Sequence, residues 1–164
     1  TGSQFRANEI MGAILRVQLK RLPGILEDLR AVKRKFAARF KEQLIPSNDP
    51  AGDCGTTVGF SFANEEEARN FAASPGVEGW LPIDSGKHVY INWEPILERR
   101  GAHHEAMNPY RLPENQGLRM NYSKDMCPRT LEILRRTVYI SLNPDWTEEE
   151  LRIRIESCER ALNS

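Results

Sequence analysis

The first 44 residues carry a helical pattern, and this pattern limits the fold more than any other feature of the chain. Asn8 can cap a helix, and Glu9 follows in the first turn, where the helix dipole favours a carboxylate. Apolar residues then recur at helical spacing, at Ile10, Ala13, Ile14 and Val17. Because Pro is tolerated in a first turn, Pro23 predicts a second helix from about residue 23 to residue 44.

The predicted second helix separates apolar from basic residues. Its apolar face consists of Ile25, Leu29, Val32, Phe36 and Phe40. Its basic residues are Lys33, Arg34, Lys35 and Arg39. A basic face can contact phosphate groups, but the acidic residues Glu27, Asp28 and Glu42 around it favour a solvated surface. At about 1.5 Å per residue the helix would be roughly 33 Å long, which suits a connector between domains.

The remaining residues predict an α+β arrangement behind a loop at residues 46–55, which is rich in Pro, Asp and Gly. Alternation predicts strands over residues 56–62, 77–83 and 138–142, and helical patterns fall at 64–73, 130–136 and from Thr147 onward. Thr147 and Glu150 fit the S/T-x-x-E capping box. We expect long N-terminal helices, then a small, mostly antiparallel sheet with helices on one face. The expected division is residues 1–45 and 46–164.

Composition excludes several classes of protein. Lys plus Arg and Asp plus Glu both number 23, so no net field attracts nucleic acid or an anionic membrane. No apolar run approaches the length of a membrane span. The three cysteines are an odd number without a Cys-x-x-Cys pair, which is typical of a reduced, cytoplasmic protein.

Most motifs of catalysis and metal binding do not occur in the sequence. His103 and His104 are adjacent, and adjacent side chains of an extended segment point to opposite sides, so a shared metal ion is disfavoured. The chain contains no Gly-x-Ser-x-Gly elbow and no Gly-rich phosphate loop. Cys127 precedes Pro128 in a loop and has no flanking cationic cluster that would activate its thiol, so we expect it to be a small buried residue.

The irregular insert at residues 84–127 is the remaining candidate for a binding site, since long ordered loops are often functional. It combines Tyr90, Trp93 and Tyr110 with Asn92, Asn108 and histidines. Such a mixture can form the wall of a site for a polar ligand such as a sugar. An equally good alternative is that these aromatic residues pin the insert to the sheet.

Several stretches along the chain form a recognisable series. The first is the turn at residues 2–9, followed by Gly12, Ala13 and residues 18–22 of the first helix. The others, in order along the chain, are residues 30–36, 88–95, 126–130, 137–144 and 146–150. Together these stretches resemble the DegT–StrS family of pyridoxal-phosphate sugar aminotransferases, and the resemblance covers nearly the whole chain. Its specificity comes from the order and spacing of these stretches, since each stretch is modest when taken by itself.

The resemblance implies that the chain is the C-terminal portion of a fold-type-I enzyme of the cytoplasm, with pyridoxal 5'-phosphate as cofactor. The family transfers an amino group from an amino-acid donor, usually glutamate or glutamine, to a keto sugar that is commonly linked to a nucleotide. The enzyme would be a homodimer without nucleic-acid or membrane partners. A related dehydratase, with His in place of the cofactor-holding lysine, and a free-standing small-domain binding module without chemistry remain alternatives.

The resemblance also assigns site residues. The turn's cofactor-binding Asn has its counterpart in Gln4, which would reach the cofactor phosphate of the neighbouring subunit, and Arg6 matches the family's Arg. The expected substrate-binding residues are His88, Tyr90, Asn92 and Trp93. The cofactor-holding lysine belongs upstream of the turn, so we assign no catalytic residue and no metal ligand, and expect this chain to be inactive by itself.

A further expectation concerns the apolar faces of the N-terminal helices. Residues such as Ile10, Ile14 and Val17, and likewise Ile25, Leu29 and Phe36, would pack on a missing large domain. Left uncovered, they would form a larger apolar patch than monomers usually expose, and favour self-association or fraying.

Overall fold

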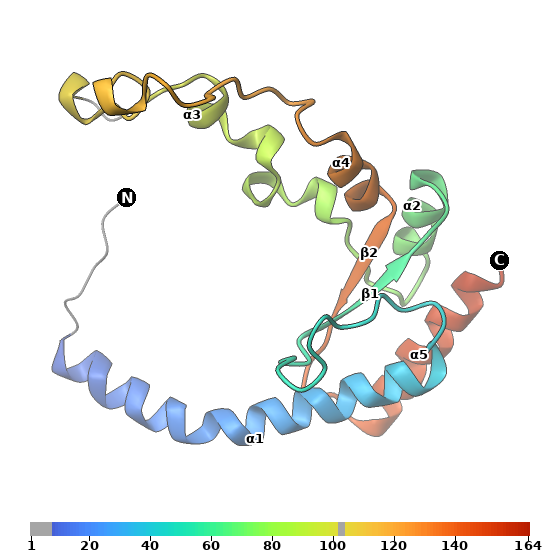
Figure 1. Cartoon of the computed structure of the whole chain (residues 1–164). Helices are drawn as coiled ribbons and strands as arrows, with labels where there is room; N and C mark the ends of the chain where they lie inside the picture. The colour runs from blue at the N-terminus through green and yellow to red at the C-terminus, as the bar shows by residue number, and fades with distance from the viewer. Residues whose placement is uncertain (1–7, 102–103) are drawn as a thin grey trace. The chain divides into compact units, whose positions relative to one another are not determined.

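The computed structural model describes residues 8–101 and 104–164, and its fold is α+β (Figure 1). The helices are α1 (Glu9–Arg39), α2 (Glu65–Ala73), α3 (Glu94–Leu97), α4 (Pro128–Arg135) and α5 (Glu148–Leu162). The strands are β1 (Thr57–Ser61) and β2 (Thr137–Ser141). Short 3-10 helices lie in the insert and directly before it: η1 (Pro82–Asp84), η2 (Gly86–His88), η3 (Tyr90–Asn92), η4 (Glu105–Met107) and η5 (Pro113–Asn115).

Helix α1 is a single helix of 31 residues, so the prediction of two helices is wrong. Pro23 lies inside it, not at a start. Proline removes one intrahelical hydrogen bond, but Pro23 is exposed, so water can reach the carbonyl that loses its partner. The predicted cap is confirmed, because the Asn8 side chain accepts a hydrogen bond from the amide of Met11 at 2.7 Å.

The helix also ends earlier than residue 44, because the chain turns to meet β1. The Phe40 amide donates to the Phe36 carbonyl at 3.0 Å, which closes the last turn. Leu44 then forms an antiparallel bridge with Phe60, and the Ile45 amide donates to the Gly59 carbonyl at 2.7 Å.

Strands β1 and β2 form a two-stranded sheet. The pairing is antiparallel, with hydrogen bonds from the Leu142 amide to the Thr56 carbonyl at 2.8 Å and from the Phe62 amide to the Arg136 carbonyl at 2.9 Å. The predicted strand at residues 77–83 is wrong. Only Trp80 bridges to Tyr139 there, because Glu78 adopts a positive φ of 52° and Pro82 begins η1.

The chain forms two compact units, each described here by itself. The first comprises Thr1–Phe60 and Ile140–Ser164, and the second comprises Ser61–Tyr139. The expected division at residues 45 and 46 stays a prediction.

The core of the first unit combines the C-terminal half of α1 with β1 and α5. Buried residues include Leu29, Val32, Phe36, Phe40, Val58, Phe60, Leu151 and Cys158. The rings of Phe40 and Phe60 meet edge to face at 5.5 Å between centroids. Ion pairs of Lys35 with Glu148 and of Arg39 with Glu159 connect α1 to α5. The capping box of Thr147 and Glu150 is confirmed at the start of α5.

The second unit has its own apolar core, to which α2 and α4 contribute. Its buried residues include Ala68, Phe71, Val77, Leu81, Val89, Leu131 and Val138. Asn64 caps α2 by accepting a hydrogen bond from the Glu67 amide at 2.9 Å. The helix predicted over residues 64–73 is thereby confirmed. Helix α4 lies beside η1, which starts the insert.

Candidate functional site

The four predicted substrate-binding residues follow one another along the insert of the second unit. His88 ends η2, Tyr90 and Asn92 belong to η3, and Trp93 stands directly before α3. Tyr90 is half-buried, whereas the other three side chains are exposed.

Three of these side chains hold the insert together. Tyr90 Oη donates a hydrogen bond to the Lys124 carbonyl at 2.6 Å and accepts one from the Cys127 amide at 3.1 Å. Asn92 Nδ2 donates to the Gly86 carbonyl at 2.7 Å, and Trp93 Nε1 donates to the Lys87 carbonyl at 2.6 Å. The polar groups thus pin the insert to itself and not to the sheet. The Trp93 ring remains 41% exposed, and a role of these residues in substrate binding stays a prediction.

The other aromatic residue of the predicted wall, Tyr110, lies elsewhere in the insert. Its ring meets that of Tyr122 edge to face at 6.4 Å, and both line a cavity of about 490 Å³ that none of residues 88–93 lines. Asn108 is buried, and its Oδ1 accepts a hydrogen bond from the Tyr110 amide at 3.1 Å. Sequence reasoning missed Tyr122, which has no motif around it.

The structure describes only some of the remaining residues that the sequence singled out. Gln4, Arg6 and His103 lie outside the described residues. His104 Nδ1 accepts a hydrogen bond from the Ala106 amide at 3.2 Å and so caps η4. Within residues 8–101 and 104–164, no group of three or more His, Cys, Asp or Glu side chains can hold a metal ion.

Cys127 is exposed, so the expectation of a buried residue is wrong. It precedes Pro128 at the start of α4, whose buried residue is Leu131. Cys158 is the buried cysteine of the three, and loss of solvation raises the pKa of its thiol to about 12.

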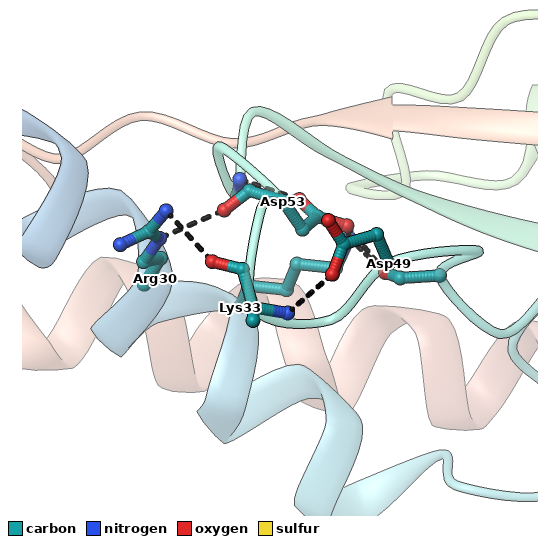
Figure 2. Close-up of polar contacts among 7 residues, drawn as sticks. Arg30, Lys33, Asp49 and Asp53 are labelled. Atoms are coloured by element: carbon teal, nitrogen blue, oxygen red, sulfur yellow. Dashed lines mark hydrogen bonds and ion pairs between the residues drawn. The ribbon is translucent and has the colours of Figure 1, made fainter.

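A polar cluster in the first unit joins α1 to the loop at residues 46–55 (Figure 2). Lys33 Nζ donates to Asp53 Oδ2 at 2.6 Å and to Ser47 Oγ at 3.1 Å. The Ser47 hydroxyl donates to the same carboxylate oxygen. These contacts anchor a loop that, by its composition, has little apolar area to bury.

Arg30 and Gly55 complete the attachment of the loop. Arg30 Nε donates to the Asp53 carbonyl at 2.7 Å, and its Nη2 donates to the Ala51 carbonyl at 3.3 Å. Gly55 has a φ of +74°, and a Cβ at this position would lie 2.8 Å from the Leu29 carbonyl carbon. Only glycine fits here, because both the backbone conformation and the close approach to α1 exclude a side chain.

Asp53 is stabilised as a carboxylate. The hydrogen bonds from Lys33 and Ser47, together with one from the Gly55 amide at 2.6 Å, lower the pKa of Asp53 to about 2. The ion pair is largely sheltered, since both side chains are only 24% exposed.

The cluster forms one wall of a cavity of about 570 Å³. Four cations line the cavity with Asp53: Arg30, Lys33, Arg34 and Lys41. The sequence favoured a solvated basic face, and this holds for Arg34, which pairs with the exposed Glu27 at 2.8 Å. The sequence analysis did not predict that the loop at residues 46–55 folds onto Arg30 and Lys33. The sequence signal for it was Asp53 two residues before Gly55, because an aspartate side chain often accepts a hydrogen bond from the backbone amide two residues further on.

No protein-family model matches the sequence. None of the helices in the described ranges has both the length and the apolar character needed to cross a membrane.

Proposed function

We propose that this chain is the C-terminal part of a cytoplasmic, pyridoxal-phosphate-dependent aminotransferase. The enzyme transfers an amino group from glutamate or glutamine to a keto sugar, commonly a nucleotide-linked one, and acts as a homodimer. The observation that carries the proposal is the order and spacing of the family-like stretches, from the turn at residues 2–9 to residues 146–150.

The local structure supports this proposal at both ends of the chain. Helix α1 begins at Glu9, the last residue of the family-like stretch at residues 2–9, and Asn8 caps it. The closing stretch at residues 137–144 contains β2, and residues 146–150 contain the capping box of α5. The α+β class of the fold agrees with the proposal, because the resemblance implies a small α+β domain.

The proposed cofactor contacts are argued from donor chemistry. The amide of Gln4 and the guanidinium of Arg6 are donors of the type that binds phosphate. Gln4 would donate its hydrogen bond to the cofactor phosphate in the neighbouring subunit. When bound, the pyridine ring supplies an electron sink for proton transfers at the substrate. We assign no catalytic residue to this chain.

The predicted substrate residues differ in what they can offer a sugar. Tyr90 and Asn92 donate their hydrogen bonds inside the insert. His88 and the exposed Trp93 ring remain for substrate contact. In this proposal Trp93 stacks on an apolar face of the sugar and His88 bonds a hydroxyl group, while Tyr90 and Asn92 hold both in place.

The decisive experiment uses the protein that contains this chain together with all residues encoded upstream. Purified with pyridoxal phosphate, it should absorb in the visible region and lose this absorbance when the cofactor is removed. Gln4→Ala should weaken cofactor binding by about tenfold, which corresponds to one hydrogen bond to a charged group. Gln4→Asn should restore binding, and Gln18→Ala on the exposed surface of α1 serves as the control.

Absence of visible absorbance would contradict the proposal. Cofactor binding without amino transfer, with His at the cofactor-holding position, would instead identify a dehydratase. A monomer that folds cooperatively alone and binds a sugar phosphate without cofactor would identify a binding module.

A further inference from the structure

The cavity of about 570 Å³ beside α1 has the features of a ligand site, and residues between Leu44 and Asp53 form its other side. Its volume of about 570 Å³ falls in the range of small-molecule pockets, about 300 to 1,000 Å³. All of its lining residues belong to the first compact unit. One side is basic and the other is apolar.

The basic side is a stripe along α1. Arg30, Arg34 and Ala37 recur at helical spacing and so share one face, and Lys41 follows in the turn that ends the helix. Ala37 has the smallest side chain of the stripe and lines the cavity between the cations. A larger residue at this position would narrow the space between the cations.

The four cations differ in how much of their charge is compensated. Lys33 has its charge balanced by Asp53, and Arg30 is fixed by two loop carbonyls. Arg34 pairs with Glu27, but both side chains are 63% exposed, and such pairs contribute little. Lys41 has no ion pair or hydrogen bond with any residue in the described ranges. Lys41 therefore offers a ligand an unpaired charge, and Arg34 offers one that it shares only with the exposed Glu27.

The apolar side is formed by Leu44, Ile45, Pro46 and Pro50. Ile45 and both prolines are exposed to solvent. A ligand that covered them would remove apolar surface from water, which is favourable in proportion to the area buried. The ligand that fits both sides has two negative charges at one end and an apolar body at the other.

We propose that this cavity binds a small phosphate monoester that carries an apolar or aromatic group. Its phosphate accepts hydrogen bonds from Arg34 and Lys41, and its apolar group lies against Ile45 and the two prolines. Lys33, Asp53 and Arg30 hold the loop in position. This inference does not rest on the proposed aminotransferase function.

Phenyl phosphate is a suitable probe, titrated into the 164-residue chain by calorimetry at about pH 7.5, above the second phosphate pKa of about 6. Arg34→Gln and Lys41→Gln should each weaken binding about tenfold, since each removes a charge-assisted contact. The matched controls are Arg16→Gln and Lys20→Gln, on the exposed part of the same helix, which should change binding by less than about twofold. Added salt should also weaken binding.

Ala37→Leu tests the location without changing charge. It should weaken binding by obstructing the space between the cations, whereas Ala13→Leu on the exposed part of α1 should have no effect. Circular dichroism verifies that each variant stays folded.

Any of three results would overturn the proposal. The first is that phenyl phosphate does not bind at a concentration of about 10 mM, since a dissociation constant above this value would be too weak for a specific site. The second is that the Arg34→Gln and Lys41→Gln variants bind phenyl phosphate as tightly as the two control variants. The third is that phenol or inorganic phosphate binds as tightly as phenyl phosphate, in which case one side of the cavity plays no part.

Discussion

The two halves of α1 belong to one continuous helix but have opposite surroundings. Over residues 9–22 the large apolar side chains are exposed: Ile10, Met11, Ile14, Leu15, Val17, Leu19 and Leu22. Over the second half, Leu29, Val32 and Phe36 are buried in the core of the first unit. The periodicity of a helix therefore tells which face is apolar, but it does not tell whether the chain contains a partner for that face.

The difference has a simple physical origin. The second half of α1 leads into Phe40, which packs on Phe60, and Lys35 and Arg39 form ion pairs with α5. The expectation that Leu29 and Phe36 pack on a missing domain is therefore wrong, since this chain itself covers them. Ile10, Ile14 and Val17 remain exposed, as that expectation requires for the first half.

Truncation of one apolar side chain in each half gives the largest contrast. Phe36 is fully buried, so Phe36→Ala should lower the free energy of unfolding by about 3 to 5 kcal/mol through lost burial and a cavity. Ile14 is 56% exposed, so Ile14→Ala should cost less than about 0.5 kcal/mol. Urea denaturation followed by circular dichroism measures both. If Ile14→Ala were as costly as Phe36→Ala, the first half would be covered in solution.

Two glycine replacements sharpen the comparison, one within α1 and one in the loop that packs against it. Gly55→Ala should destabilise the first unit by about 2 kcal/mol, because a Cβ there meets the backbone at Leu29 and the positive φ is strained. Gly24→Ala is the control, since nothing lies within 4 Å of its added Cβ and alanine favours a helix by about 1 kcal/mol. Thermal melts should move in opposite directions. A neutral Gly55→Ala would mean that the loop does not rest on α1.

Acid titration tests the contact of Lys33 with Asp53, which belongs to the covered half alone. The pKa of Asp53 is about 2 in the folded chain, compared with 3.8 for a free aspartate carboxyl. A lowered folded pKa stabilises the fold above the unfolded pKa, and this contribution is lost as pH falls from about 4 to 2. It should amount to about 1 to 2 kcal/mol.

Asp53→Asn removes this part of the pH dependence, so its unfolding free energy should fall less than that of the parent chain between about pH 4 and pH 2. Asp28→Asn on the surface of α1 is the matched control and should titrate like the parent. Identical profiles for all three proteins would show that the ion pair does not form.

The sequence predicted those features that depend on neighbours along the chain. The caps at Asn8, Asn64 and Thr147 are confirmed because a short polar side chain bonds an amide three residues ahead. The packing of the loop at residues 46–55 onto α1 was not predicted, because Lys33 and Asp53 are 20 residues apart and neither belongs to a motif. Pro23 was misread because exposure, which decides whether a proline is tolerated, is a property of the folded chain.

Hydrogen exchange compares the free energies at which backbone amides open in the two halves of α1, and these are the smallest effects predicted. Amides at residues 29–36 lie in the core of the first unit and should exchange only on global unfolding, whereas those at residues 10–20 should open for about 0 to 1 kcal/mol, as fraying termini do. The exposed apolar residues also favour association of copies. If this occurs, protection at residues 10–20 should rise with protein concentration, and Ile14→Glu should abolish the rise. Equal and concentration-independent protection of both halves would mean that α1 is stable along its whole length without a partner, and the contrast between its halves would then have no energetic consequence.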